Sequence, residues 1–328
     1  MTMPRRPLGK TGTTVSALAL GGHHLGDAPS YDVAERLVAE AIDGGITFFD
    51  NCWEYHNGRS EEWLGRALAE RSASSAGSRR DRVLVMTKVC THGRSARDAD
   101  LAMTMLEESL RRLRTDRIDV WQVHGLGFDN DPDLAYRRDG VLEALDQAKR
   151  SGKVRFVGFS GHKSPDVHFD LVTRGYAWDT CQFPLNAFDA TFRSFEQRVL
   201  PECNRRGIGV LGMKPMTGKA EPIHKNVVTP EEMLRYAMSL PVATTICGMD
   251  SVEHLRANLK VAQSFKPLSP AEMQTLRDRC RPLASDGRFE LYKVSLAFDN
   301  PQAREAHGFP IDPTQKEVKE AIEQVIGK

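Results

Sequence analysis

Four residues of types that act together in proton transfer stand at the ends of apolar stretches. Asp50 ends the run ITFF, and Tyr55 follows it in a short polar loop. Lys88 and His124 follow two later apolar runs in the same way. Taken singly, each could be a satisfied polar group at the end of a strand. The four together favour a site, because parallel strands bring such ends to one place.

A phenol beside an ammonium group has a specific chemical use. A free phenol, with a pKa of about 10, is a poor proton donor at neutral pH, and a nearby ammonium stabilises its anion. We therefore expect Lys88 to lower the pKa of Tyr55. A partly buried lysine needs a carboxylate partner, for which Asp50 is the candidate. His124 could then hold a carbonyl oxygen by a hydrogen bond, which completes an arrangement suited to reducing a carbonyl with hydride.

The rest of the chain alternates short apolar runs with amphipathic segments, after a small hairpin predicted at residues 5–16. The predicted strands cover residues 17–20, 46–49, 82–87, 118–123, 154–159, 180–183, 208–212 and 243–247. The predicted helices cover residues 31–43, 60–71, 98–113, 141–151, 165–174, 192–206, 230–240 and 252–264. Eight such pairs favour an α/β fold closed into a (β/α)8 TIM barrel over a doubly wound sheet.

The barrel is expected over residues 1–265 and a C-terminal extension over residues 266–328. The extension is predicted to be helical at residues 270–283 and 315–326 and irregular at residues 286–313. It could cover the barrel mouth or contact another subunit, and its sequence does not choose between the two.

Composition excludes several classes of partner. The 45 basic and 44 acidic residues give a net charge of +1, so no global field favours nucleic acid or an anionic membrane. Six cysteines without a CxxC pair fit reduced thiols in a cytoplasmic protein. Pro7 and a turn interrupt the Arg5-Arg6 pair before it could start a twin-arginine signal, and no apolar run reaches the ~20 residues of a membrane span. We expect a monomer or small homo-oligomer acting on a small molecule.

A family resemblance rests on seven motifs between Arg6 and Phe265. In chain order they are RPLGKTGTTVSALALGG, FFDNCWEYHNGRSEEWLG, MTK, IDVWQVH, GKVRFVGFSGH, CQFPLN and GMDSVEHLRANL. Their order and spacing resemble the aldo-keto reductase superfamily. The resemblance implies a barrel that binds a nicotinamide cofactor without a Rossmann domain. It also implies a catalytic tetrad of Asp50, Tyr55, Lys88 and His124, in which Tyr55 is the general acid.

The same resemblance implies a set of cofactor contacts, with Ser160 and Gln182 at the nicotinamide carboxamide and Asn258 at the adenine. The complete predicted set is Gly22, Ser160, Gln182, Met213, Lys214, Gly248, Asp250, Ser251, Arg256 and Asn258. Many members have Ser-Asn where this chain has Ser160-Gly161, so one carboxamide contact is missing unless His162 supplies it. Met213 stands where an aromatic ring usually stacks on the nicotinamide. Lys214 begins a loop that could lie along the pyrophosphate.

The choice of cofactor depends on the sequence after Gly248. Members that prefer NADPH commonly have a basic residue there, and this chain has Asp250-Ser251. A carboxylate repels a 2′-phosphate and can accept a hydrogen bond from a free 2′-hydroxyl. Among NAD(P)(H) cofactors the sequence therefore slightly favours NAD(H). Arg256 is a cation that could offset the repulsion between Asp250 and a 2′-phosphate.

The predicted substrate pocket contains His23, His24, Trp53, His56 and Phe128. Adjacent residues on a strand point to opposite sides, so His23 and His24 make a poor metal pair, and no metal is predicted. The favoured function is an oxidoreductase that reduces an aldehyde, ketone or sugar carbonyl, or oxidises the alcohol. Two alternatives are a cofactor-sensing regulatory subunit with little turnover and a metal-dependent hydrolase that uses His23, His24, His124 and His162.

Overall fold

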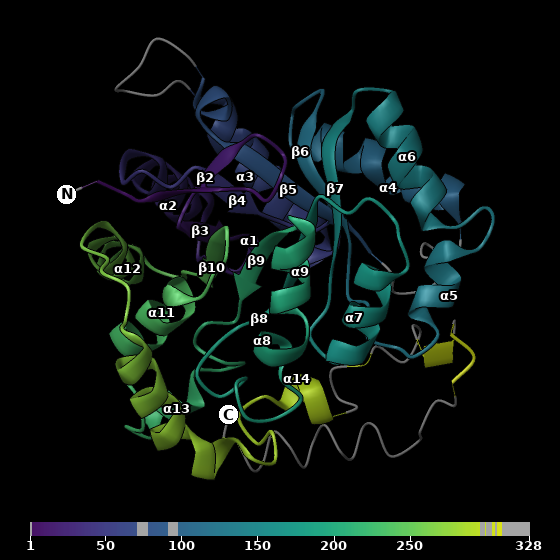
Figure 1. Cartoon of the computed structure of the whole chain (residues 1–328). Coiled ribbons are helices and arrows are strands. Elements are labelled where there is room, and N and C mark those ends of the chain that lie inside the picture. The colour runs from purple at the N-terminus through teal and green to yellow at the C-terminus, as the bar shows by residue number, and fades with distance from the viewer. Residues whose placement is uncertain are drawn as a thin grey trace.

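Eight parallel strands form a closed barrel in which each strand pairs with its sequence neighbour and the last pairs with the first (Figure 1). The computed structural model describes residues 2–70, 78–90, 98–295, 299, 304–305 and 307–309. The barrel strands are β3 (Leu18–Gly21), β4 (Phe48–Asp50), β5 (Leu84–Val89), β6 (Ile118–Val123), β7 (Val154–Ser160), β8 (Thr180–Pro184), β9 (Gly209–Met213) and β10 (Thr244–Gly248). The predicted (β/α)8 TIM barrel is confirmed, and every strand boundary lies within two residues of the predicted one.

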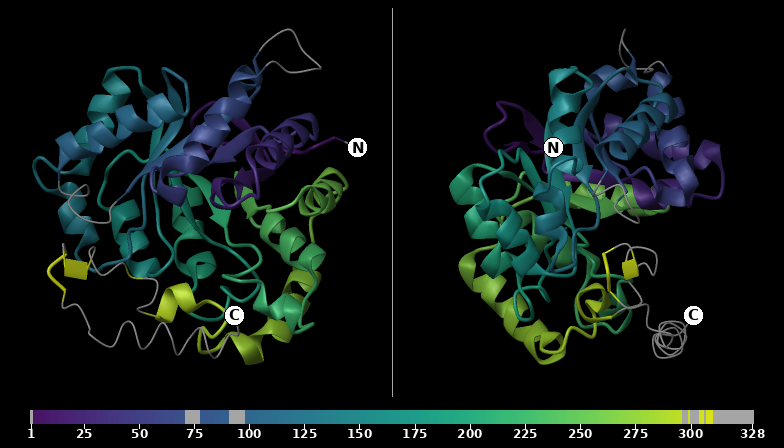
Figure 2. Two further views of the ribbon diagram at one scale, coloured as in Figure 1. Left: turned by 180° about the vertical axis from the view of Figure 1, so that it is seen from behind. Right: turned by 90° about the vertical axis from the view of Figure 1, so that its right-hand side faces the viewer.

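Helices surround the barrel, as Figure 2 shows from two further sides. The helices that follow the barrel strands in the repeating pattern are α2 (Tyr31–Asp43), α3 (Arg59–Ala69), α4 (Ala99–Arg112), α6 (Val141–Arg150), α7 (Pro165–Thr173), α9 (Leu200–Arg206), α11 (Pro230–Ser239) and α12 (Val252–Gln263). Each has an apolar face; in α2 this face buries Leu37, Val38 and Ala41. Ser30 caps α2 by accepting a hydrogen bond from the backbone N–H of Val33 at 3.4 Å, which satisfies one free donor of its first turn.

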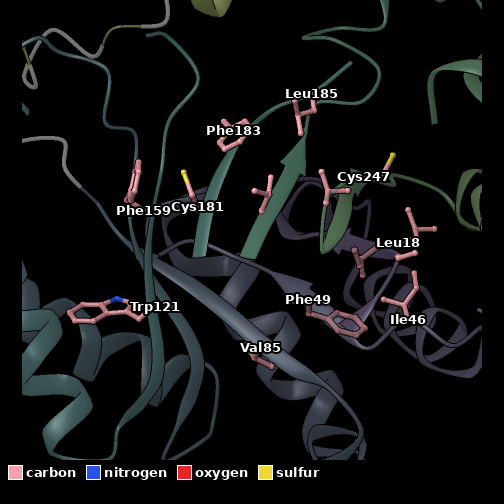
Figure 3. Packing of buried hydrophobic residues seen from close by; sticks show 14 of the residues in the cluster. Leu18, Ile46, Phe49, Val85, Trp121, Phe159, Cys181, Phe183, Leu185 and Cys247 are labelled. Atoms are coloured by element: carbon pink, nitrogen blue, oxygen red, sulfur yellow. The ribbon is translucent and has the colours of Figure 1, made fainter. Parts of the chain in front are cut away.

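Neighbouring strand residues belong to two separate apolar clusters. Phe49, Val85 and Trp121 pack in the cluster between the strands and the helices (Figure 3), whereas Phe48 and Met86 belong to a smaller cluster inside the barrel. This division follows from strand geometry, because successive side chains point to opposite faces. Side chains two residues away from Phe48 or Met86 along the same strand therefore also point to the barrel axis.

The predicted N-terminal hairpin is present as β1 (Arg5–Pro7) paired antiparallel with β2 (Thr14–Ser16). Its Leu8 and Val15 are fully buried in the inner cluster with Phe48 and Met86. Lys10 donates its backbone N–H to Gly207 O at 2.8 Å, which ties the turn to the segment before β9. The hairpin thus packs against the amino-terminal ends of the strands, opposite the predicted site.

The helix predicted at residues 192–206 is wrong in one respect, because it is two helices. α8 (Phe195–Arg198) ends before Val199, and α9 begins at Leu200 with Pro201 in its first turn. A proline at that position has no N–H to continue the preceding helix and suits the start of a new one. Four short helices were not predicted: α1 (Gly22–Gly26), α5 (Asp131–Tyr136), α10 (Glu221–His224) and α14 (Leu291–Val294).

The described part of the extension contains the predicted helix as α13 (Pro270–Ala284) and the short helix α14. Lys293 of α14 is fully buried, and its Nζ donates to Asp189 Oδ1 at 2.6 Å and to Glu290 Oε2 at 2.9 Å. Asp189 follows β8, so this ion cluster fixes the extension to the barrel. The helix predicted at residues 315–326 lies outside the described residues. In the parts of the chain that the structure describes, no helix combines the length and the apolar character of a membrane span.

Candidate active site

Polar side chains gather at the carboxyl ends of five neighbouring strands. Asp50 ends β4, Lys88 lies near the end of β5, His124 follows β6, and Ser160 and Gln182 lie at the ends of β7 and β8. Asp50 and Lys88 are each two residues after an inner-cluster residue, Phe48 and Met86. By strand alternation both point to the barrel axis. The barrel strands themselves therefore position the ion pair of the site.

Lys88 and Asp50 form the predicted ion pair. Lys88 is 1% exposed and Asp50 is 5% exposed, and the ammonium contacts Asp50 Oδ1. The same ammonium donates to the backbone oxygen of Asn51 at 2.7 Å. Gln182 Nε2 lies 3.5 Å from the other carboxylate oxygen of Asp50, at the limit of a hydrogen bond. These contacts hold the lysine in one orientation.

Tyr55 approaches this pair from the turn after β4. Its hydroxyl lies 3.4 Å from Lys88 Nζ. His56, Asn57 and Gly58 have φ values of 52°, 56° and 89°, so the chain makes a sharp left-handed turn between Tyr55 and α3. Glycine takes such a φ without strain, which suits Gly58 to the start of α3. The turn points the phenol to the barrel axis while the chain leaves towards the outer helices.

The expected net lowering of the Tyr55 pKa is wrong, because other contributions outweigh that of Lys88. The pKa of Tyr55 is raised well above its usual value, first by burial and then by the negative charges of Asp50, Cys52 and Glu54. Burial disfavours the phenolate, and the carboxylate that binds Lys88 offsets the positive charge of the ammonium. Tyr55 therefore keeps its proton in this state of the protein.

His124 is held by two residues that the sequence analysis missed. Its Nδ1 lies 2.7 Å from Glu54 Oε1 and 3.3 Å from Cys52 Sγ. Its ring meets the ring of Tyr55 edge-on, with centroids 5.8 Å apart. Glu54 also accepts a hydrogen bond from the Cys90 thiol at 2.8 Å. Glu54 could have been found from its position in the sequence, because it directly precedes Tyr55 in the loop that follows β4.

Three of the predicted pocket histidines lie around Tyr55. β3 ends at Gly21, so His23 and His24 stand in the first turn of α1 and not on the strand. The rings of His23 and Tyr55 meet edge-on at 5.2 Å, and His56 Nε2 lies 2.8 Å from His23 O. Burial, followed by the charges of His24, His56 and Lys214, lowers the pKa of His23 to about 4. The His23 ring thus lies beside the phenol as a neutral imidazole at pH 7.

The other two predicted pocket residues contact different elements. Trp53 Nε1 donates to Glu108 Oε2 at 2.6 Å, and the Arg112 guanidinium lies 5.2 Å from the indole centroid, so the indole packs on α4. Phe128 stacks on His307, with centroids 4.4 Å apart, and on Phe309 at 5.5 Å. His307 and Phe309 of the extension therefore pack on the loop that contains Phe128. A pocket role for either aromatic residue stays a prediction.

The residues predicted to hold the nicotinamide half of the cofactor lie on the ends of β7, β8 and β9. Ser160 Oγ donates to Val123 O at 3.3 Å. A Cβ at Gly161 would lie 2.0 Å from Leu126 O, so the backbone would have to shift to accept any side chain there. His162, the candidate substitute, packs edge-on against Tyr292 of α14, and burial lowers its pKa well below the usual value.

The predicted pyrophosphate loop begins at the end of β9. Met213 is the last residue of that strand and is partly buried. Lys214 follows it with φ 53°, and its Nζ lies 5.0 Å from the Tyr292 centroid. Burial lowers the pKa of Lys214. The start of the loop therefore packs against Tyr292 of α14, in the extension.

The residues predicted to hold the adenosine half surround the end of β10 and the start of α12. Gly248 is the last residue of β10 and pairs with Gly21, the residue that precedes Gly22. Asn258 Nδ2 donates a hydrogen bond to Cys247 Sγ at 3.5 Å. Ser251 caps α12, and Asp250 Oδ1 lies 2.6 Å from His254 Nδ1. Arg256 binds Glu40 of α2 through two hydrogen bonds of 2.7 and 2.9 Å. Arg256, the predicted cation for a 2′-phosphate, is therefore already paired with a carboxylate.

Known proteins provide independent comparisons. The sequence model described as "Aldo/keto reductase family" matches residues 17–220. The oxidoreductase YrpG of Bacillus subtilis is 30% identical over 227 residues, which cover 64% of this chain and 66% of YrpG. L-galactose dehydrogenase of Arabidopsis thaliana is 29% identical over 228 residues, which cover 64% of this chain and 65% of that enzyme. The chain thus spans about two thirds of the length of each of these relatives.

A solved structure shows the same fold. Aldo-keto reductase AKR11C1 from Bacillus halodurans superposes with a TM-score of 0.69 at 24% identity, covering 84% of this chain and 96% of that one. At this identity the likeness concerns the fold alone. Because the family model covers more than half of the sequence, the chain belongs to the aldo/keto reductase family, a family of oxidoreductases.

Proposed function

We propose that the protein reduces an aldehyde, ketone or sugar carbonyl with NAD(P)H, or oxidises the corresponding alcohol, with Tyr55 as the general acid or base. The observation that carries this proposal is the 3.4 Å contact between the Tyr55 hydroxyl and Lys88 Nζ, with Lys88 paired to Asp50 at the carboxyl end of the barrel. Named relatives that are oxidoreductases or dehydrogenases support the same reaction class. A regulatory subunit and a metal-dependent hydrolase find no such support.

The roles of the side chains follow from their contacts. Tyr55 keeps its proton until negative charge develops on a carbonyl oxygen, and it then gives up that proton. The ammonium of Lys88 stabilises the phenolate at that moment, and Asp50 with Asn51 O holds the ammonium in position. His124, fixed by Glu54 and Cys52, presents its imidazole to the same oxygen. A nicotinamide cofactor would supply the hydride.

The ends of β7 and β8 fit the carboxamide of such a cofactor. Gln182 Oε1 is buried and has no hydrogen-bond partner among the described residues. A carboxamide N–H₂ is a donor that would satisfy this oxygen. Ser160, paired in register with Gln182, offers a hydroxyl beside it.

For the adenosine half we propose a preference for NAD(H). The carboxylate of Asp250 is largely exposed and would repel a 2′-phosphate. Arg256, the cation that could offset this repulsion, is bound by Glu40. Both observations favour a free 2′-hydroxyl over a phosphate.

For the substrate we propose a polyhydroxylated carbonyl compound, such as a sugar. The His23 ring lies against Tyr55, with the rings of His24 and His56 next to it, and imidazole nitrogens can bind hydroxyl groups. L-galactose dehydrogenase, one of the relatives, acts by its name on a sugar. We further propose that the protein works in the cytoplasm as a monomer or small homo-oligomer, and its six free, buried thiols fit that reducing compartment.

The experiment compares wild type with Tyr55→Phe on a panel of aldehydes, ketones and sugars with NADH and NADPH. Loss of the phenolic proton should lower kcat by about 100-fold or more while cofactor binding, measured by fluorescence, stays unchanged. Tyr31→Phe is the matched control, because the Tyr31 hydroxyl is buried on α2 with no partner among the described residues. A Tyr55→Phe enzyme that kept wild-type kcat would refute the role of Tyr55.

A further inference from the structure

Three side chains of different chemistry converge beside Tyr55. Cys52 Sγ, a carboxylate oxygen of Glu54 and a ring nitrogen of His124 all lie within 4.8 Å of one another. Two of the separations are 3.3 Å, between Cys52 Sγ and His124 Nδ1, and 2.7 Å, between Glu54 Oε1 and the same nitrogen. A thiol, an imidazole and a carboxylate are the three donor types that zinc sites use.

The two separations from His124 Nδ1 are close to those of such a site. In a tetrahedral zinc centre with bonds of about 2.0 to 2.3 Å, donor atoms stand roughly 3.3 to 3.7 Å apart. An ion would therefore need the Glu54 oxygen to withdraw from His124 Nδ1 by less than about 1 Å. The donors lie at the ends of β4 and β6, so strands that pack in the barrel fix their backbone positions.

The surroundings also suit a cation. Cys90 donates its thiol to the second oxygen of Glu54 at 2.8 Å, a contact of the kind that steadies a metal-binding carboxylate. The side chains of His124 and Glu54 are 19% and 22% exposed, so an ion can reach them from the barrel mouth. Cys52 is fully buried, so it would bind an ion from the protein side of the site.

We propose that Cys52, Glu54 and His124 form a binding site for one thiophilic divalent cation of the zinc class. On binding, the Cys52 S–H bond breaks, a sulfur–metal bond forms, and the proton leaves to solvent. The three protein donors leave a fourth position, which water fills. Each donor already has a partner in the protein, so the ion replaces the Glu54–His124 and Cys52–His124 contacts.

The test is a titration of the reduced, tag-free full-length protein with Co²⁺ and then Zn²⁺. Wild type should show a thiolate-to-cobalt charge-transfer band that saturates at one ion per chain and disappears when Zn²⁺ displaces Co²⁺. Cys52→Ser should lose the band. Cys280→Ser is the matched control, because Cys280 is equally buried but lies in α13, and this variant should keep the band.

A second variant keeps the proposal testable if Cys52→Ser fails to fold. Glu54→Gln retains the shape of a partly exposed side chain and should weaken Zn²⁺ binding, measured against a competing chelator, by about 10-fold or more. Absence of the band in wild type, its persistence in Cys52→Ser, or an affinity unchanged by Glu54→Gln would each overturn the site. Tyr55→Phe should still bind the ion, so failure of the proposed reaction and failure of the cation site are distinguishable.

Discussion

The ammonium of Lys88 contacts the carboxylate of Asp50 and lies 3.4 Å from the hydroxyl of Tyr55. Lys88 is 1% exposed, so its charge is stabilised by this carboxylate and by Asn51 O and hardly by water. One buried cation thus neutralises a buried carboxylate and, in the proposed mechanism, also assists the phenol. These two contributions can be separated by substitution.

Lys88→Met should lower both stability and turnover. Removing one partner of a buried pair leaves Asp50 without compensation, which lowers the free energy of unfolding by about 3 to 5 kcal/mol. The double variant Asp50→Asn with Lys88→Met should regain part of that loss, and kcat should remain at least about 100-fold below wild type. Urea unfolding and steady-state rates measure the two effects.

Lys153→Met is the control for this substitution, because Lys153 forms an exposed pair with Glu107. Its unfolding free energy should change by no more than about 1 kcal/mol. If the double variant lost as much unfolding free energy as the Asp50→Asn and Lys88→Met variants lose together, the two side chains would not be energetically coupled.

Lys293→Met tests the attachment of the extension to the barrel. Asp189 and Glu290 share the Lys293 ammonium, and all three side chains are at most 1% exposed. The variant should lose about 3 to 5 kcal/mol of unfolding free energy, because two buried carboxylates lose their cation. Thermal unfolding followed by circular dichroism gives the change in Tm, and Lys149→Met, in a more exposed pair with Asp179, should change it little. Equal Tm values for the two variants would show that the cluster does not hold α14.

Gly161→Ala tests whether packing at this position excludes a side chain. The added Cβ would lie 2.0 Å from Leu126 O and 2.5 Å from His168 Cε1, so the backbone must shift. We expect a loss of about 1 to 3 kcal/mol in urea unfolding. Gly218→Ala, whose Cβ would lie 3.7 Å from its nearest atom in Tyr292, should stay within about 0.5 kcal/mol of wild type. A neutral Gly161→Ala would mean that packing does not exclude asparagine.

Asp250→Asn tests the proposed cofactor preference. If the carboxylate repels a 2′-phosphate, removing its charge should raise kcat/KM for NADPH by about tenfold and leave that for NADH nearly unchanged. Glu253→Gln, an exposed change in the first turn of α12, is the control. A wild-type kcat/KM that already favours NADPH by tenfold would refute the preference itself.

The sequence by itself determined the barrel and the strand ends that build the site. Apolar runs of strand length that alternate with amphipathic helices predict parallel strands, and the alternation of side chains along a strand is a local property. Asp50 and Lys88 therefore stand inside the barrel for reasons visible within a few residues of each. The boundaries of α8 and α9 were wrong because Pro201, read as helix interior, lies at the start of a new helix.

Only the tertiary structure decided how distant residues meet. Glu54 holds His124, 70 positions later in the sequence, and Phe128 stacks on His307 of the extension. The direction of the Tyr55 pKa shift was equally hidden, because it depends on how deeply the phenol is buried and on which carboxylates surround it. The periodicity and spacing of residues in the sequence predict local geometry. Burial and long-range contacts arise only when the closed barrel brings the strand ends together.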